Sequence, residues 1–329
     1  MRSMRAVVVG SYVQDHIWRT AKLPSPGESR IGTFSSGAGG KGFNQAVALA
    51  RQLSNPADVH FIGALGNDLL APLAKLAASK FGLHCTWFEK SASTAAASVI
   101  VDGGGANLIC VALGANAQLG ANEISKLLQN SLHADSFPGV VLVQLEIALP
   151  ATKAALEFAR KNAVRSILNP APINADVSAE LLALADILTP NETELIFLLN
   201  HLYRYEFSAS DFHDDEALHR AARVLSQGTV VVTMGAAGVF VSHGADRMGD
   251  LAPYYRCAAH AVAVVDTTGA GDAFSGGLAA ASLLFSETPF SEWVAHAMKV
   301  AALSIQANGA ADSMPSFDEV LTKLGGAQC

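Results

Sequence analysis

The stretch of the chain with the clearest chemical potential is a glycine-rich turn, Asp266-Thr267-Thr268-Gly269-Ala270-Gly271-Asp272. We expect it to join a short apolar strand at 261–265 to an apolar helix over 273–285. A glycine turn that opens a helix leaves backbone N–H groups unpaired and adds the positive end of the helix dipole, which attracts an anion. In the first helical turn, the Asp272 carboxylate could deprotonate a hydroxyl beside a phosphoryl group. Asp is also a common helix cap, and these residues alone leave both roles open.

A second glycine-rich stretch, Gly37–Gly42, precedes an amphipathic helix expected over 43–53. Its glycines match the GxGxxG spacing of dinucleotide-binding loops. They follow a long polar excursion and not a strand, however, which disfavours a Rossmann dehydrogenase. The loop is not a Walker A motif either, because no Ser or Thr follows Lys41. What remains is a glycine loop with Lys41, Asn44 and Gln45, which are groups suited to binding hydroxyls or an anion.

The order of apolar segments predicts an α/β fold with a central, mostly parallel β-sheet flanked by helices. Short apolar runs alternate with helical patterns, and strands separated by helices form parallel sheets. An excursion at 11–36 and an expected hairpin at 95–113 do not fit this alternation. We expect them to form a small β-sheet lid, from about 11–40 and 93–114, within a single domain over 1–329. The expected strands of the main sheet are 5–9, 60–64, 140–145, 166–168, 187–188, 230–233 and 239–242.

Polar residues follow the expected strands, where a buried sheet would otherwise have plain turns. The carboxyl ends of parallel strands meet at one edge, which is the usual ligand edge of such a sheet. Each segment alone could be a simple turn or cap, but five of them at one edge predict a binding site. The segments are Gln144-Leu145-Glu146, Asn169–Pro172, Thr189–Glu194, Thr233–Gly238 and the Asp266–Asp272 turn.

The composition argues against several classes of function. Half of the 329 residues are hydrophobic and 16% are charged, which suits an α/β enzyme with buried strands. The net charge of -7 and the lack of a basic run argue against a nucleic-acid partner. No apolar run approaches a membrane span, the N-terminus has no signal-peptide pattern, and the four cysteines include no CxxC pair. We therefore expect a cytoplasmic protein with reduced thiols and no membrane partner.

Taken together, these segments resemble the ribokinase-like (PfkB) carbohydrate kinases. The resemblance runs nearly end to end, and the Asp266–Asp272 turn is highly specific for the superfamily. Gly39–Ala46, with the Gln-Leu-Glu and Asn-Pro-Ala-Pro segments, favours the ribokinases within it. The resemblance implies a ribokinase-like fold and ATP-dependent phosphorylation of the 5-hydroxyl of D-ribose, giving ribose 5-phosphate. It also implies Mg²⁺ and a monovalent cation, usually K⁺.

The resemblance further implies a role for each matching residue. Asp272 would take the proton of the sugar hydroxyl, and the amides of Gly269, Ala270 and Gly271 would stabilise charge on the moving phosphoryl group. The sugar would be bound by Val13, Asp15, Gly39, Gly40, Lys41, Asn44, Glu146 and Asp272. The nucleotide would be bound by Asn191, Glu194, Thr233, Gly235, Gly238 and Gly271. Its phosphates and Mg²⁺ would lie near Asn191 and Glu194. The monovalent cation would be bound by Asp266, Thr268, Ser304, Ala307, Gly309 and Ser313.

Three positions depart from the family pattern. Val13 stands where many ribokinases have an Asn that contacts the sugar. Phe43 replaces a small residue and could reshape the sugar pocket. Met298 replaces a residue that is often Asn near the base of the nucleotide. The same transfer to another sugar or to a nucleoside therefore stays open. So does a non-catalytic sugar- or nucleotide-binding protein, although such a protein need not retain Asp272. Related enzymes often pair their lids, so we also expect a homodimer through the β lid.

Overall fold

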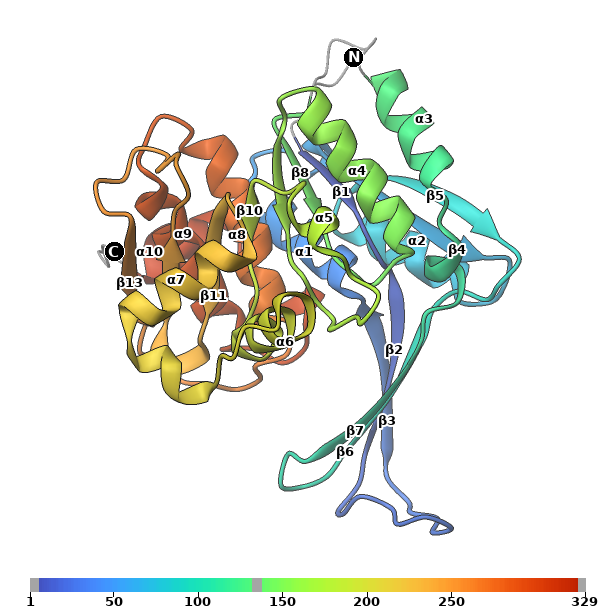
Figure 1. Ribbon diagram of the computed structural model, residues 1–329. Coiled ribbons are helices and arrows are strands. Elements are labelled where there is room, and N and C mark those ends of the chain that lie inside the picture. Colours follow the sequence, from blue (N-terminus) through green and yellow to red (C-terminus); the bar gives the residue numbers. More distant parts are fainter. Residues whose placement is uncertain (1–5, 132–137, 325–329) are drawn as a thin grey trace.

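The computed structural model describes residues 6–131 and 138–324, which fold around two separate β-sheets (Figure 1). The main sheet has nine strands in the order β13-β12-β11-β10-β9-β8-β1-β4-β5. Every neighbouring pair from β11 to β5 is parallel, which confirms the predicted fold class. The strands are β1 (Ala6–Val9), β4 (Val59–Gly66), β5 (His84–Lys90), β8 (Val140–Val143), β9 (Arg165–Leu168), β10 (Ile187–Leu188), β11 (Thr229–Thr233), β12 (Val239–Ser242) and β13 (Tyr254–Cys257).

Helices cover both faces of the main sheet, because successive strand residues point to opposite faces. Val8 and Leu142 belong to one core, and their neighbours Val7 and Val143 belong to the other. The first core is covered by α1 (Lys41–Gln52), α2 (Ala71–Lys80), α8 (Ala270–Leu284), α9 (Phe290–Ser304) and α10 (Phe317–Lys323). The second is covered by α3 (Ala121–Ser131), α4 (Leu149–Lys161), α5 (Ala179–Leu182), α6 (Glu192–Tyr203) and α7 (Asp215–Leu225). Short 3₁₀ turns occur at Pro56–Asp58, Gly114–Gln118, Ala209–His213, Gly235–Ala237 and Ala311–Ser313.

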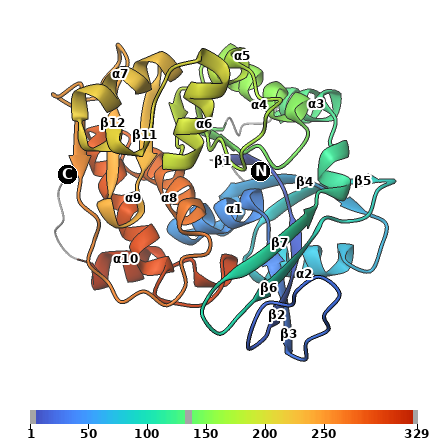
Figure 2. The same cartoon turned by 60° about the horizontal axis from the view of Figure 1, so that its bottom comes forward.

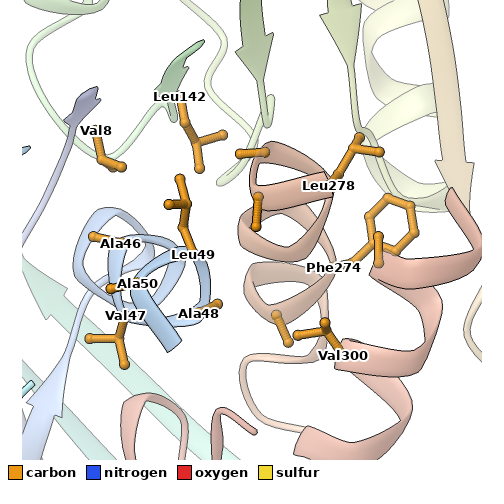
Figure 3. Packing of buried hydrophobic residues seen from close by; sticks show 14 of the residues in the cluster. Val8, Ala46, Val47, Ala48, Leu49, Ala50, Leu142, Phe274, Leu278 and Val300 are labelled. Carbon is orange, nitrogen blue, oxygen red and sulfur yellow. The ribbon is translucent and has the colours of Figure 1, made fainter. Parts of the chain in front are cut away.

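Helices α1 and α8 lie side by side in the first core, with Leu49 of α1 and Leu278 of α8 among the residues that fill it (Figure 3). Gly276 permits their close approach, since a Cβ at this position would lie 2.5 Å from the backbone oxygen of Gln45 and 2.6 Å from the Cβ of Ala48. Each helix begins with one of the two glycine-rich stretches. Their packing therefore brings together two motifs that are far apart in the sequence.

The second sheet has four strands in the order β3-β2-β6-β7 and projects from the body of the molecule (Figures 1 and 2). Strands β6 and β7 form the predicted hairpin, and β2 pairs antiparallel with β3 and parallel with β6. The predicted small sheet is therefore present. Sequence analysis did not assign β2 and β3 as strands, because the outer parts of this sheet are exposed and lack the apolar runs of buried strands. The bounds are β2 (Val13–Arg19), β3 (Thr33–Gly39), β6 (Ala96–Val101) and β7 (Asn107–Ala112).

The predicted strand at 261–265 is wrong. This segment is irregular, and Val264 and Val265 are 60% and 55% exposed. The backbone N–H groups of Val265 and Asp266 donate to the carbonyl oxygen of Ile305 (2.8 and 3.2 Å), so the segment is tied to the turn after α9 and not to the sheet. Apolar composition alone did not distinguish this loop from a strand.

One edge of the main sheet is antiparallel. Strand β12 is antiparallel to β11, because the loop at 234–238 is too short for the helical crossover that a parallel pair needs, and β13 is in turn antiparallel to β12. Cys85 and Cys110 are free thiols, as predicted. Cys329 lies outside the described residues. None of the helices in the described part of the chain is long and apolar enough to cross a membrane.

Candidate active site

Asp272 lies in the first turn of α8, as predicted, and the structure separates its two possible roles. The N-cap of this helix is Gly269, whose φ of 78° is a left-handed conformation that favours glycine. Asp272 is therefore not the cap, and its side chain, on a residue only 6% exposed, makes other contacts. A Cβ added to Gly271 would meet no neighbouring atom of the described chain within 4 Å. The space at the helix N-terminus is thus open to an anion.

Both carboxylate oxygens of Asp272 accept hydrogen bonds from the first turn of α1. Asn44 donates from Nδ2 to Oδ2 (2.9 Å), and Gln45 donates from Nε2 to Oδ1 (3.0 Å). The Oδ1 atom of Asn44 is buried and has no hydrogen-bond partner among the described residues. Because an unpaired buried carbonyl oxygen is unfavourable, this atom is a candidate acceptor for a ligand hydroxyl.

Glu146, in the loop after β8, reaches the same corner of the molecule from the edge of the sheet. Its Oε2 accepts hydrogen bonds from the hydroxyl of Ser11 (2.6 Å) and the backbone N–H of Lys41 (2.9 Å). The Ser11 hydroxyl oxygen in turn accepts from the backbone N–H of Gly42 (3.2 Å). These bonds hold the end of β1, the start of α1 and the loop after β8 together.

Asp15 on β2 brings a further carboxylate from the small sheet. Its side chain lies against Gly39, where an added Cβ would overlap the carboxylate. The backbone oxygen of Asp15 accepts from Ser36, but no donor of the described chain forms a hydrogen bond with the carboxylate. Burial, reinforced by the charges of Glu146 and Asp272, raises the pKa of Asp15 to about 6. A half-buried carboxylate without partners is suited to accept hydrogen bonds from ligand hydroxyls.

Lys41 is the cation among these carboxylates. Burial lowers the pKa of Lys41, but the charges of Asp272, Glu146 and Glu194 outweigh burial and hold that pKa above its usual value. Glu194 belongs to a capping box at the start of α6, in which Asn191 Oδ1 accepts from Glu194 N and Glu194 Oε2 accepts from Asn191 N (2.8 Å each). Burial raises the pKa of Glu194 despite that hydrogen bond. The lysine thus balances part of the charge of an acidic site.

The predicted nucleotide residues are only partly joined to this group. Thr233, at the end of β11, pairs with Asn191 through an isolated parallel bridge. Gly235 and Gly238 lie in the loop between β11 and β12, with positive φ values of 50° and 88°. Within residues 6–131 and 138–324, neither glycine shares a hydrogen bond with the group around Asp272.

The predicted cation ligands divide into two sets. Asp266 Oδ1 accepts from the backbone N–H (2.9 Å) and hydroxyl (2.7 Å) of Thr268, and its Oδ2 accepts from the backbone N–H of Gly309 (3.0 Å). Two buried serines in the other set donate to carbonyl oxygens three residues earlier. In the described chain, three of the predicted ligands share no hydrogen bond with Asp266: Ser304, Ala307 and Ser313.

The three departures from the family pattern take different positions. Val13 is buried in the small apolar cluster of the second sheet, so it offers apolar surface and no hydrogen bond. The ring of Phe43 is fully buried in the first core, edge-on to Tyr12 at 5.3 Å between ring centroids. It therefore belongs to the core and not to the group around Asp272. Met298 is also buried in the first core, on α9.

The chain is similar to known proteins over nearly its whole length. The sequence pattern of the pfkB family carbohydrate kinases matches residues 4–316. Ribokinase from Schizosaccharomyces pombe is 35% identical to this chain, and the alignment covers 95% of this chain and 96% of that relative. Ribokinase from Haemophilus influenzae is 34% identical, and the alignment covers 96% of this chain and 97% of that relative. The solved structure of Arabidopsis thaliana ribokinase complexed with ribose and ATP superposes with a TM-score of 0.79 at 27% identity, covering 99% of this chain and all of that one. The chain belongs to the pfkB family of carbohydrate kinases.

In this pfkB kinase, three buried polar residues contact one another beside Asp272: Gln45, Gln144 and Asn169. Sequence analysis expected Gln45 on α1 to bind a ligand, but its side chain is engaged by Asn169, Asp272 and Gln144. Sequence analysis gave Gln144 and Asn169 no individual role, because a polar residue at the end of a strand is common in turns. The structure shows that all three side chains are buried, which a turn residue does not need to be.

Gly39 provides a test of the Asp15 position. We expect Gly39→Ala to fold normally, because the φ of Gly39 is not in the left-handed region, but to displace the Asp15 carboxylate. In calorimetry with the sugar that the wild type binds best, Gly39→Ala should reduce the affinity about 10-fold or more. This reduction corresponds to a loss of at least ~1.4 kcal/mol of binding free energy. Gly37→Ala is the matched control, since a Cβ there meets nothing within 4 Å. Equal affinities for the two variants would contradict the assignment of Asp15 to the sugar.

The raised pKa of Asp15 predicts a pH-dependent stability. The Asp15 carboxyl holds its proton more tightly in the folded protein than in the unfolded chain. The contribution of Asp15 to the free energy of unfolding is therefore fully present below pH 4 and is lost as the pH rises through about 6. Asp15→Asn removes the half-buried charge, and at pH 8 it should raise the free energy of unfolding by up to about 3 kcal/mol. Urea titrations at pH 4.5 and 8 without ligand measure this difference, which should shrink at the lower pH. Exposed Asp176→Asn is the control, and a wild type more stable than Asp15→Asn at pH 8 would refute the prediction.

Proposed function

We propose that this protein is an ATP-dependent kinase that phosphorylates the 5-hydroxyl of D-ribose to give ribose 5-phosphate. The observation that carries the proposal is the buried Asp272 carboxylate at the open N-terminus of α8, with Asn44 beside it. The full-length similarity to ribokinases supports the choice of sugar. A helix N-terminus open to an anion and a base next to it are the parts that phosphoryl transfer needs.

In the proposed reaction, Asp272 accepts the proton of the sugar hydroxyl as its oxygen attacks the γ-phosphorus of ATP. The bond from that phosphorus to the bridging oxygen breaks, and ADP leaves with the bonding electrons. The amides of Gly269, Ala270 and Gly271 stabilise the charge of the moving phosphoryl group, and Lys41 adds a positive charge nearby. Asp15 and the free oxygen of Asn44 accept hydrogen bonds from the other sugar hydroxyls. Most of the catalysis is positioning and charge neutralisation.

Asn191 and Glu194 are proposed to lie near Mg²⁺. The donor set fits, because Mg²⁺ prefers carboxylate and water oxygens and usually reaches its protein ligands in part through water. Burial raises the pKa of Glu194, and a nearby divalent cation would favour its ionised form. When bound, Mg²⁺ supplies neutralisation of phosphate charge.

A monovalent cation, K⁺, is proposed next to Asp266. Asp266, Thr268 and Gly309 are contiguous, and they provide a carboxylate, a hydroxyl and backbone carbonyl groups, which are the ligands that hard cations take. Exchange of K⁺ for Na⁺ at constant ionic strength should change turnover. Equal rates in the two salts would count against this site.

The small sheet is proposed to act as a lid and to pair with a second copy of the chain. Five of its large apolar side chains are between 37% and 59% exposed: Trp18, Phe34, Leu108, Ile109 and Val111. Exposed apolar strands are usually covered in a stable protein. A sedimentation mass near the monomer value of 34.2 kDa at micromolar concentration would contradict pairing.

The central prediction concerns Asp272→Asn. We expect this variant to fold and to bind sugar with little change, because the amide nearly preserves the shape of the side chain. Turnover in a coupled ADP-release assay should fall about 10²–10⁴-fold, since one well-placed base is lost. Near-normal turnover would refute the assignment of Asp272.

The same assay separates the proposed function from its alternatives. The wild type is tested with ATP, Mg²⁺ and K⁺ against ribose, deoxyribose, fructose and several nucleosides. Preference for another acceptor would keep the transfer and change the substrate, with Val13 as the first residue to examine. No turnover on any acceptor, with ATP still bound, would favour a non-catalytic binding protein.

A further inference from the structure

Three side-chain amides connect Asp272 to the ends of three neighbouring strands. The carbonyl oxygen of Thr189, after β10, accepts from Nδ2 of Asn169, after β9 (2.8 Å). Oδ1 of Asn169 accepts from Nε2 of Gln45 on α1 (3.0 Å). Oε1 of Gln45 accepts from Nε2 of Gln144, after β8 (2.6 Å). Gln45 and Gln144 have no exposed surface, and Asn169 is 6% exposed.

The orientation of each amide follows from the carbonyl at one end of this series. Because the oxygen of Thr189 can only accept, Asn169 presents its NH₂ group to it and its oxygen to Gln45. Gln45 must then present its NH₂ group to Asn169, and the same group lies 3.0 Å from Oδ1 of Asp272. Gln144 contacts the remaining oxygen of Gln45. Rotation of the Gln45 amide by 180° would break all three of its hydrogen bonds.

The hydrogen-bonding capacity of Gln45 differs from that of its neighbour Asn44. Both N–H groups of Gln45 and its oxygen are engaged within the protein, and the residue is fully buried. Because Gln45 has no exposed surface, the second lone pair of its oxygen is not accessible to a ligand. Asn44, in contrast, keeps an unpaired Oδ1. Asn44 is thus suited to contact the substrate, whereas Gln45 can act only through Asp272.

We propose that Gln45 is a positioning residue that orients the Asp272 carboxylate for proton transfer, and that Gln144 acts through Gln45. The inference rests on the proposed kinase function. Asp272 stands on a helix, and its carboxylate can rotate about two side-chain bonds. The bond from Gln45, fixed by the sheet through Asn169 and Gln144, restricts that rotation. Small losses of alignment at a reacting group can lower turnover about 10²-fold.

The test compares two buried glutamines of the same helix. Gln45→Met keeps the approximate length of the side chain and removes its hydrogen bonds. Gln52→Met is the matched control, because Gln52 is 1% exposed on α1 and donates to the carbonyl oxygen of Pro315, away from Asp272. We expect Gln45→Met to lower kcat about 10–100-fold with KM within about threefold of the wild type. Gln52→Met should keep kcat within about twofold of the wild type, even where its melting temperature falls as much as that of Gln45→Met.

Two further variants distinguish positioning from a general loss of structure. Gln144→Met should lower kcat in the same direction as Gln45→Met, and by less, because Gln45 retains its own bond to Asp272. In an Asp272→Asn background, adding Gln45→Met should change the residual rate less than about twofold, since its effect passes through the base. Additive losses, or a raised KM with unchanged kcat, would overturn the positioning role. So would a loss of kcat in Gln52→Met equal to that in Gln45→Met.

The proposed function and this inference fail in different ways. If the wild type turns over none of the acceptors, the kinase function is overturned, and the positioning role with it. A wild type that turns over ribose, together with an equally active Gln45→Met, would overturn the positioning role alone.

Discussion

The close contact between α1 and α8 is the constraint on which the site depends. Gly276 lets α8 approach the backbone of α1, and no larger residue fits without moving one helix. Both helices begin at the same corner of the molecule, since Asn44 and Asp272, in their first turns, are hydrogen-bonded. Two positive helix ends therefore converge on one place. An anionic ligand there interacts with both dipoles, and the same convergence offsets part of the charge of the nearby carboxylates.

The carboxylates themselves are held at a cost to stability. Burial raises the pKa of Asp15 and of Glu194, which means that the folded protein disfavours their ionised forms. Lys41 offsets part of this charge, but one cation cannot balance several acids. Groups that destabilise the unliganded protein in this way are common where a ligand later supplies the missing partners. Sugar hydroxyls and a metal ion are partners of the kind that such acids lack.

The sequence allowed the parallel sheet, α1, α8 and the position of Asp272 to be predicted, because their signals are local. Buried parallel strands are continuous apolar runs, and glycine marks the start of each helix. The segment at 261–265 has the same apolar composition as a strand, but its end is hydrogen-bonded to the turn after α9 and not to a sheet. Strands β2 and β3 were missed for the opposite reason, since their outer residues are exposed and polar in part.

The contacts of Gln45 could not be predicted from the sequence for a physical reason. Its partners Gln144 and Asn169 are 99 and 124 residues away, and Asp272 is 227 residues away. Their meeting depends on how α1 packs on the sheet and on α8, which no local pattern encodes. A polar residue at the end of a strand indicates a possible ligand edge, but it does not reveal whether the side chain binds a ligand or another side chain. For Gln45, complete burial together with a partner for each N–H group and for the oxygen separates the two cases.

The small sheet links the site to the proposed pairing of two chains. Alternation along β2 places Asp15 and Ile17 on one face and His16 and Trp18 on the other. The rings of His16 and Trp18 pack against Phe34 of β3 at 5.8 and 5.3 Å between centroids, so the second face is apolar and aromatic. Ile109, which is paired with Val99 on β6, is exposed on the face of Asp15. A sheet with apolar groups on both faces is most stable when both are covered. In the proposed function, the sugar would lie against the face of Asp15, and a second copy of the chain would cover exposed apolar side chains of the sheet.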